Sequence, residues 1–267
     1  MEGRCNELVG DMDELVARAR SERDPAMRRA LKEQYDALHD EWSAVKSELT
    51  AAKEVQANAV RGIVGTFRTL GAEHGKHASD YFDLSGATAA VRKMVEDALP
   101  FVPRDWLNTM RAAGVRVETL AEPRRSSRRN QPPPRSYFSP TTNTIYIARG
   151  KDKLTVVHEM MHAMDEHSQA FFDDSHDFFV RRTRGKQLRR LANTDPTRNY
   201  GPREQAFDMD GHCVSPYAYK RYADTVTGDL YAFEVSSVGV EYLYRNPLSF
   251  AADPDHLAFV LHKLREV

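Results

Sequence analysis

Two histidines and a glutamate in the stretch VVHEMMHAMDEH have the spacing H-E-x-x-H, which could bind a metal ion and activate water. Because positions i and i+4 lie on one face of a helix, His158 and His162 can present both imidazoles to one cation. Glu159 projects to the neighbouring side of that turn, where its carboxylate could take a proton from a metal-bound water. The pattern predicts a zinc site, and the alternative is a pair of core histidines satisfied by ordinary hydrogen bonds.

A catalytic zinc site needs a third protein ligand and one open position, and the residues just after the motif do not supply that ligand. The metzincin spacing would require glycine and histidine where this chain has Asp165 and Ser168. A downstream carboxylate is the alternative. Glu234 and Glu241 are seven residues apart and share a helix face, and the small residues Ser236, Ser237 and Gly239 of the intervening VSSVGV would let this helix approach the first one closely. We therefore expect Glu234 to be the third ligand and Glu241 to orient a ligand histidine.

Two stretches of the chain resemble parts of the zincins, a class of zinc metallopeptidases. HEMMHAMDEH resembles the H-E-F-x-H-x-x-D form of the motif in the anthrax lethal factor group, with Asp165 at the position of the aspartate. SPYAYKRY and the later FEVSSVGVE resemble the P-Y-x-x-K-x-Y and T-E-V-x-S-x-G-x-E segments of zincin-like domains in phage head-morphogenesis proteins. The likeness spans roughly residues 100–267 and places that pattern's first glutamate on Glu234. Phe233 stands where the pattern usually has threonine, so a hydrogen bond from that hydroxyl is absent.

This resemblance implies a gluzincin-like zinc peptidase in an α+β domain over residues 71–267, mostly helical with a small mixed sheet. In such a peptidase Zn²⁺ is held by His158, His162 and Glu234, and Glu159 is the general base for hydrolysis of a protein or peptide substrate. Two rival hypotheses keep the same fold. One is a non-catalytic phage structural or assembly protein, and the other is a protease toxin delivered into other cells.

Peptide hydrolysis also needs a hydrogen-bond donor for the oxyanion besides the metal. Tyr222, just before the expected ligand helix, is the first choice for this donor, with Tyr217 and Tyr219 less favoured; aromatic packing is at least as good a role for any single one. Asp165 lies one turn beyond His162 and is expected to support the metal site as a further carboxylate, unless it is only a residue of the helix surface.

Hydrophobic periodicity and turn residues predict the elements that must position these side chains. Helices are expected over 87–98, 103–113, 151–167, 171–192, 230–250 and 253–267, and strands over 115–120 and 143–148. The stretch 121–136 between the two strands is rich in proline and arginine and is expected to be a solvated loop rather than a phosphate-binding site. The helix that carries the histidines is thus expected to follow directly from a strand.

The N-terminal part of the chain is rich in Ala, Glu, Arg and Lys and poor in Gly. Apolar and aromatic residues follow one seam of a helix in alternating steps of four and three, at Leu31, Tyr35, Leu38, Trp42, Val45, Leu49 and Ala52. Asp24 followed by Pro25 is typical of a helix start, and a shorter amphipathic segment, Leu8 to Ala19, precedes it. We expect a helical hairpin or coiled-coil arm over residues 1–70, whose seam packs either on the rest of this chain or on a coiled-coil partner.

Charge and composition limit the other roles of the chain. Its 267 residues carry 38 Lys and Arg against 39 Asp and Glu, so no overall field attracts it to a membrane surface or to nucleic acid, and neither is an expected partner. No apolar run of about eighteen residues predicts a membrane span, and the charged N-terminus lacks the apolar core of a secretion signal. The two cysteines, Cys5 and Cys213, have neither zinc-knuckle nor disulfide-scaffold spacing. We expect a cytoplasmic protein, or a virion-associated or delivered one under the rival hypotheses.

Overall fold

A computed structural model of the chain describes residues 1–71, 77–121, 135–195, 200–223, 227–228 and 230–265. The contacts divide the chain into two compact units, Met1–Ala59 and Val60–Val267, named here the N-terminal unit and the C-terminal unit. The boundary between them lies inside the long helix α2 (Pro25–Gly71), whereas the sequence prediction placed it after residue 70, near the end of that helix.

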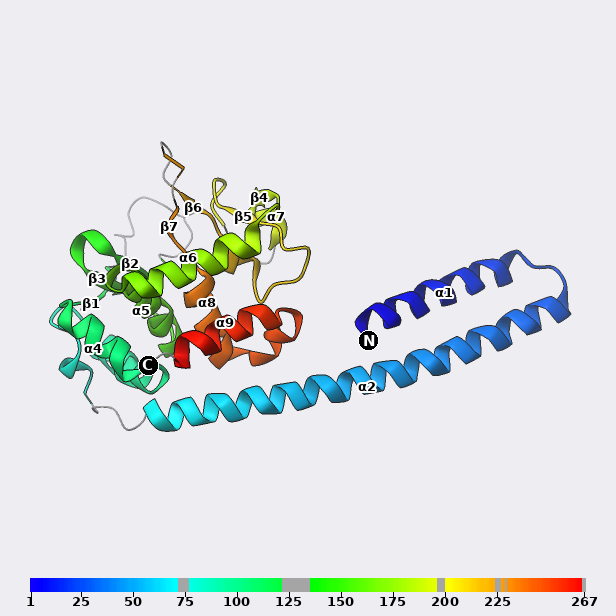
Figure 1. Ribbon diagram of the computed structural model, residues 1–267, viewed down its shortest axis with the longest axis horizontal. Helices are drawn as coiled ribbons and strands as arrows, with labels where there is room; N and C mark the ends of the chain where they lie inside the picture. Colours follow the sequence, from blue (N-terminus) through cyan, green and yellow to red (C-terminus); the bar gives the residue numbers. More distant parts are fainter. Residues whose placement is uncertain (72–76, 122–134, 196–199, 224–226, 229, 266–267) are drawn as a thin grey trace. The chain divides into compact units, whose positions relative to one another are not determined.

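The N-terminal unit is a helical hairpin, in agreement with the predicted helical arm. Helix α1 (Glu2–Ser21) and the first part of α2 run antiparallel beside each other (Figure 1). The Asp24 side chain accepts a hydrogen bond from the backbone N–H of Ala26 at 2.9 Å, so it caps the start of α2. Arg4 and Glu41 form an ion pair at 2.6 Å that joins the two helices.

The C-terminal unit is mostly helical, and its short strands form small sheets. Its α-helices after α2 are α3 (Ala89–Ala98), α4 (Arg104–Ala112), α5 (Lys153–His167), α6 (Gln169–Thr183), α7 (Leu191–Thr194), α8 (Val235–Arg245) and α9 (Pro254–Arg265). Its 3-10 turns are η1 (Ala78–Asp80), η2 (Leu99–Phe101), η3 (Pro140–Thr142), η4 (Pro216–Tyr219) and η5 (Pro247–Ala252). Its strands are β1 (Arg116–Thr119), β2 (Tyr137–Ser139), β3 (Thr144–Ile147), β4 (Leu188–Arg190), β5 (Gln205–Phe207), β6 (Tyr222–Ala223) and β7 (Leu230–Ala232). The predicted α+β class is therefore confirmed. Among the described residues, no helix combines the length and the hydropathy of a membrane span.

Three strands form a mixed sheet in the order β1-β3-β2, with β1 parallel and β2 antiparallel to the central β3. Val117, Ile145 and Ile147 share one face of this sheet and are fully buried. The strands predicted over 115–120 and 143–148 are confirmed. Strand β2 was missed, because it has only three residues and follows directly from the proline- and arginine-rich stretch.

Helix α5, which carries the H-E-x-x-H motif, lies at the centre of the C-terminal unit and contacts α3, α4, α6, α8 and strands β2 and β3. Gly150, with a φ of 73°, turns the chain out of β3. Asp152 then caps α5 by accepting a hydrogen bond from the Thr155 N–H at 3.0 Å. The apolar side chains around α5 are buried, namely Leu154, Val156, Val157, Met160, Met161, Ala163 and Met164. Core packing therefore holds the helix, and with it the positions of both histidines.

Helix α8 packs against both α5 and α9. A Cβ atom at Gly239 would lie 2.4 Å from Val260 Cγ2 and 2.8 Å from His256 Nε2, and both of these residues belong to α9. The sequence analysis attributed the small residues of VSSVGV to the approach of the two ligand helices. For Gly239 that attribution is corrected, because this glycine permits the approach of α8 to α9.

Two expected helices have different limits in the structure. Leu230–Ala232 is strand β7, paired with β6, so the ligand helix begins at Val235 and not near residue 230. Helix α6 ends at Thr183, and Leu188–Arg190 forms strand β4, paired with β5. Gly185, with a φ of 74°, lies between them. In both segments, pairing with a neighbouring strand overrides the helical pattern of the sequence.

Replacing Gly239 by alanine should destabilise the C-terminal unit by about 1–3 kcal/mol, because the added methyl group must displace Val260 or His256. Chemical unfolding followed by near-ultraviolet circular dichroism, which reports the packed aromatic residues, measures this loss. Gly62→Ala is the matched control, since nothing lies within 4 Å of a Cβ atom there and alanine favours a helix. Equal unfolding midpoints for G239A and the native chain would contradict the packing of α8 on α9.

Candidate metal centre

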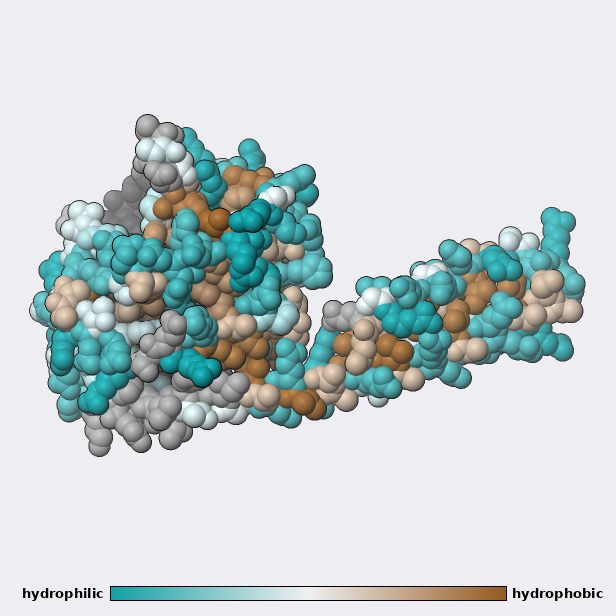
Figure 2. Space-filling model, viewed as in Figure 1, coloured by the Kyte–Doolittle hydropathy of each residue, from teal (hydrophilic) through white to brown (hydrophobic). Residues whose placement is uncertain are grey.

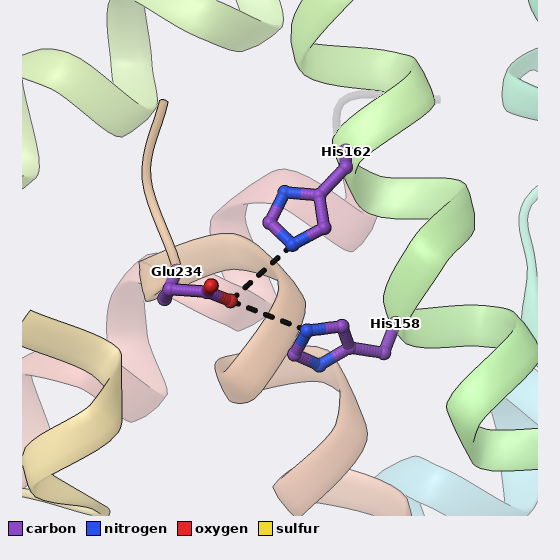
Figure 3. A group of neighbouring side chains, drawn as sticks. All are labelled: His158, His162 and Glu234. Carbon is purple, nitrogen blue, oxygen red and sulfur yellow. Dashed lines mark ion pairs between the residues drawn. The ribbon is translucent and has the colours of Figure 1, made fainter. Parts of the chain in front are cut away.

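Three side chains from α5 and from the start of α8 point toward one another (Figure 3). His158 Nε2 lies 3.2 Å from Glu234 Oε2, and His162 Nε2 lies 3.3 Å from the same oxygen. The Glu234 side chain is 2% exposed, against 12% for His158 and 17% for His162. The three potential ligand atoms all lie within 4.8 Å of one another, so this group could hold a metal ion. The structure brings together the two histidines and the glutamate that their spacing in the sequence singled out.

The two separations between the histidine nitrogens and the glutamate oxygen fit a metal ion bound by all three atoms. Ligand atoms about 2.0–2.1 Å from Zn²⁺ in a tetrahedral site are about 3.3 Å from one another. The two nitrogen–oxygen distances at Glu234 Oε2, 3.2 and 3.3 Å, have this value. Two imidazole nitrogens and one carboxylate oxygen also form a donor set typical of catalytic zinc, which keeps a fourth position for water or substrate.

The electrostatics of this group favour a positive charge at its centre. Burial opposes the charge of Glu234, but the two histidines outweigh burial and hold the pKa of this carboxyl well below its ordinary value. Burial likewise disfavours a charged His158, yet its hydrogen bonds with Glu234 and Glu241 raise its pKa well above the ordinary value. Burial also opposes a charged His162, and its attraction to Glu234 outweighs this and raises its pKa. The raised pKa values favour protons on the two histidines, in the place that a metal ion would take.

Short contacts fix the carboxylate of Glu234, which lies between β7 and α8. Tyr222 Oη donates to Glu234 Oε1 at 2.7 Å, and Ser237 Oγ donates to Glu234 Oε2 at 2.9 Å. The pairing of β6 with β7 sets Tyr222 opposite Ala232, two residues before the glutamate, and so brings its hydroxyl to the carboxylate. Tyr222, predicted as the oxyanion donor, thus contacts the third ligand itself. Ser237 was not predicted, and its position three residues after Glu234 is the only signal in the sequence.

A buried cluster holds the first turn of α8. His256 of α9 is fully buried, and its Nε2 lies 2.7 Å from the carbonyl oxygen of Val235, the residue after the ligand. Asp253, which precedes α9, accepts hydrogen bonds from Arg182 Nη2 at 2.9 Å and from Tyr219 Oη at 3.1 Å. The hydroxyl of Tyr219, one of the less favoured oxyanion donors, is therefore engaged in this cluster and not beside the metal ligands.

Glu241 lies where the sequence analysis expected it, against a ligand histidine. Its Oε2 is 3.0 Å from His158 Nδ1, and its Oε1 accepts a hydrogen bond from Arg245 Nε at 3.0 Å. Arg245 also pairs with Asp152, the capping residue of α5, at 2.9 Å. The carboxylate can thereby fix the ring orientation of His158 and leave its Nε2 free to bind a cation. Arg245 and Asp152 were not predicted as parts of the site.

Asp165 has a different partner from the one expected. Its Oδ1 accepts a hydrogen bond from Ser175 Oγ of α6 at 3.0 Å, and Ser175 Oγ lies 2.7 Å from Ser236 Oγ of α8. Its Oδ2 is buried without a hydrogen-bond partner among the described residues. Burial raises the pKa of Asp165 to about 7, although the charge of His162 opposes this rise. Asp165 therefore links α5, α6 and α8 beside the ligands, and the two serines were not predicted.

A pocket of about 330 Å³ lies beside the three ligands, and Glu159 lines it. Glu159 is 5% exposed and also lines a second hollow of about 260 Å³. Burial raises the pKa of Glu159, and the positive charge of the histidines lowers it in part. Tyr217 lines both hollows, with its Oη 3.4 Å from that of Tyr222. The larger pocket has aromatic walls formed by Tyr137, Phe138, Phe172, Tyr217, Tyr222 and Tyr231.

Replacing His162 by alanine should abolish tight zinc binding, because two ligands remain of the three. The loss of affinity should exceed the about 10–100-fold that follows from losing the partner of a ligand. Metal analysis of the purified protein after dialysis against one equivalent of Zn²⁺ measures the bound metal. His212→Ala, an exposed histidine outside the site, is the control and should retain one equivalent. A full equivalent of zinc on H162A would contradict the ligand assignment.

Zinc affinity should fall as the pH is lowered, because protons and metal compete for the same nitrogens. The pKa of His158 is raised in the metal-free protein, so its proton must be displaced even at pH values where an ordinary imidazole is neutral. The fall should therefore begin above the ordinary histidine pKa and approach about tenfold per pH unit for each proton released. Competition with a chromophoric chelator across this range measures it.

Glu241→Gln tests the cause of this pH dependence. It removes a carboxylate that raises the pKa of His158, so the fall in zinc affinity should move to lower pH. Zinc affinity that is independent of pH from mildly acidic to mildly basic conditions would contradict the competition.

The ligands, Glu159 and the pocket thus lie together in the described part of the C-terminal unit. Comparison of the chain with protein-family models, with curated proteins and with solved structures found no match.

Proposed function

We propose that the C-terminal unit is a zinc-dependent peptidase with a zincin-like, gluzincin-type fold, in which His158, His162 and Glu234 hold Zn²⁺ and Glu159 is the general base. The observation that supports this most strongly is the convergence of two imidazoles and one carboxylate beside a pocket that Glu159 also lines. When bound, zinc would polarise the scissile carbonyl and lower the pKa of a water molecule to about 7.

Glu159 is suited to carry the proton in this reaction. It lies next to the first ligand in the chain and lines the pocket that would receive the scissile bond. Its burial raises its pKa, and a carboxyl group whose pKa is closer to neutral exchanges protons more effectively at neutral pH. Glu159 takes the proton of the attacking water and passes it to the nitrogen of the departing amine.

The hydroxyl groups of Tyr222 and Tyr217 are the donors available for the oxyanion. Burial raises the pKa of both hydroxyls, so both keep their protons at neutral pH. Tyr222 Oη donates to Glu234 Oε1 at 2.7 Å, so it must turn toward the substrate before it can stabilise an oxyanion. In its present orientation Tyr222 holds the ligand carboxylate, and the neighbouring Tyr217 offers a second donor.

At the pocket, one edge of β2 is unpaired among the described residues, and this edge supports a protein or peptide as the substrate. Among the described residues, β2 pairs with β3 on one side only. Ser136, Tyr137 and Phe138, at the start of this strand, line the pocket. Extended peptides bind such edges through backbone hydrogen bonds, and apolar walls then receive alternate side chains. The aromatic walls described above are suited to apolar or aromatic side chains of the substrate.

Two alternative functions would use the same fold. A phage structural or assembly protein would work mainly through its N-terminal unit and would not need turnover, and a delivered toxin would act on a target in another cell. For the peptidase we keep the cytoplasmic location that the sequence led us to expect, and the alternatives would put the protein in a virion or a recipient cell. The burial of Glu159 favours the catalytic function over the non-catalytic one. Burying a carboxylate costs free energy of folding, and a non-catalytic protein would gain nothing from this residue beside the ligands.

Glu159→Gln should abolish peptide hydrolysis while zinc remains bound. The amide keeps the shape of the side chain but cannot accept the proton, so kcat/KM should fall by about 10²–10⁴-fold. Hydrolysis of a fluorogenic peptide library, measured beside the zinc content of the same preparation, tests both parts.

Glu96→Gln, an exposed glutamate on α3, is the control and should leave both values unchanged. Turnover by E159Q at the native rate would contradict the role of this residue. A native protein that binds zinc and cleaves no peptide in the library would favour the non-catalytic alternative.

A further inference from the structure

The N-terminal unit has an apolar seam that its own two helices cover only in part. Leu8 of α1 and Leu31 of α2 are buried in the hairpin. The rest of the seam on α2 stays partly exposed, at Tyr35, Leu38, Trp42, Val45 and Leu49. Apolar residues are visible along the surface of the hairpin in Figure 2. The ion pair of Arg4 with Glu41 sets the start of α1 beside Glu41, so Leu49 lies beyond the end of α1.

Aromatic rings and hollows follow this seam. The ring centres of Tyr35 and His39 are 6.2 Å apart, and those of His39 and Trp42 are 5.7 Å apart. Two hollows of about 300 and 430 Å³ lie beside α1, and Leu15 lines both of them. Tyr35 lines the smaller hollow and Leu38 the larger. A tyrosine beside an open hollow is typical of surfaces that receive side chains from another protein. The seam therefore has the features of an interface.

The charges of the hairpin are segregated along its length. Residues 17–32, the turn end, carry six Arg or Lys and two Asp or Glu, which gives a net charge of +4. Residues 1–16 and 33–48, the stem, together carry two Arg or Lys and ten Asp or Glu, which gives −8. If two hairpins packed in parallel, the turn end of one would lie on the turn end of the other, and the stem on the stem. Charges of the same sign would then face each other. In the antiparallel arrangement, the basic turn end of each hairpin faces the acidic stem of the other.

We propose that the N-terminal units of two copies of this chain associate antiparallel into a four-helix bundle, with the turn end of each on the stem of the other. The bundle covers the partly exposed seam, including Tyr35, Leu38 and Trp42, and side chains of the second copy enter the hollow that Leu31 and Tyr35 line. The arrangement has two-fold symmetry and uses the same surface of both copies, so it closes at two chains. It does not depend on the proposed peptidase activity.

Sedimentation equilibrium of the purified full-length chain at low ionic strength tests this association. The native chain should have twice its monomer mass of 30.4 kDa. A turn-end variant, Arg28→Glu with Arg29→Glu, lowers the net charge of the turn end from +4 to 0, and a stem variant, Asp40→Lys with Glu48→Lys, changes that of the stem from −8 to −4. Each should raise the dissociation constant at least about tenfold, because the attraction between turn end and stem is weakened. An equimolar mixture of the two variants should restore the mass of two chains, since the new glutamates at positions 28 and 29 of one then attract the new lysines at positions 40 and 48 of the other, and the second turn-end and stem contact keeps its native charges.

A matched double charge reversal on the C-terminal unit, Arg104→Glu with Arg111→Glu, should stay associated like the native chain. Equal far-ultraviolet circular dichroism of all variants establishes that the helices are intact. A native chain of one-copy mass would overturn the proposal, and so would a mixture of the two reversed variants that stays monomeric. Preferential pairing of the native chain with the turn-end variant would indicate a parallel arrangement and would overturn the antiparallel one.

Discussion

A buried carboxylate faced by two imidazoles is the interaction on which the C-terminal unit depends. Glu234 Oε2 lies 3.2 and 3.3 Å from the Nε2 atoms of His158 and His162, with almost no solvent access to the carboxylate. A negative charge in such a place needs a positive charge beside it, and either protons on the histidines or a divalent cation can supply one. Because the two compete, binding of a metal ion would release protons and would stabilise the folded state by mass action. The stability of the unit and its proposed chemistry therefore depend on the same three side chains.

The candidate ligands could be predicted from the sequence because their spacing is that of one face of a helix. His158 and His162 are four residues apart on a helix that core packing holds from most sides, so one short motif predicts both their positions and their common direction. Glu234 and Glu241 could be assigned different roles from their spacing of seven and from the need for a third ligand. The structure has Glu234 at the two Nε2 atoms and Glu241 at His158 Nδ1, which is the arrangement expected from those roles.

The contacts that hold the ligands in place could not be predicted, because they join segments far apart in the chain. Tyr222 reaches Glu234 through the pairing of β6 with β7, a segment whose own pattern predicted a helix. The same limit applies to the two other tyrosines, since spacing alone did not distinguish Tyr217 at the pocket from Tyr219 at Asp253. The edge strand β2 has three residues, too few for a period-two pattern to emerge. Tertiary pairing, rather than local preference, determined each of these features.

Anomalous diffraction at the zinc absorption edge, from crystals of the protein prepared with one equivalent of Zn²⁺, tests the metal centre most directly. The geometry predicts one strong peak about 2.0–2.2 Å from Nε2 of His158, Nε2 of His162 and a carboxylate oxygen of Glu234. A map without a peak at that place, in which both imidazoles keep their hydrogen bonds to Glu234, would contradict it. A zinc ion bound only by other residues would contradict it equally.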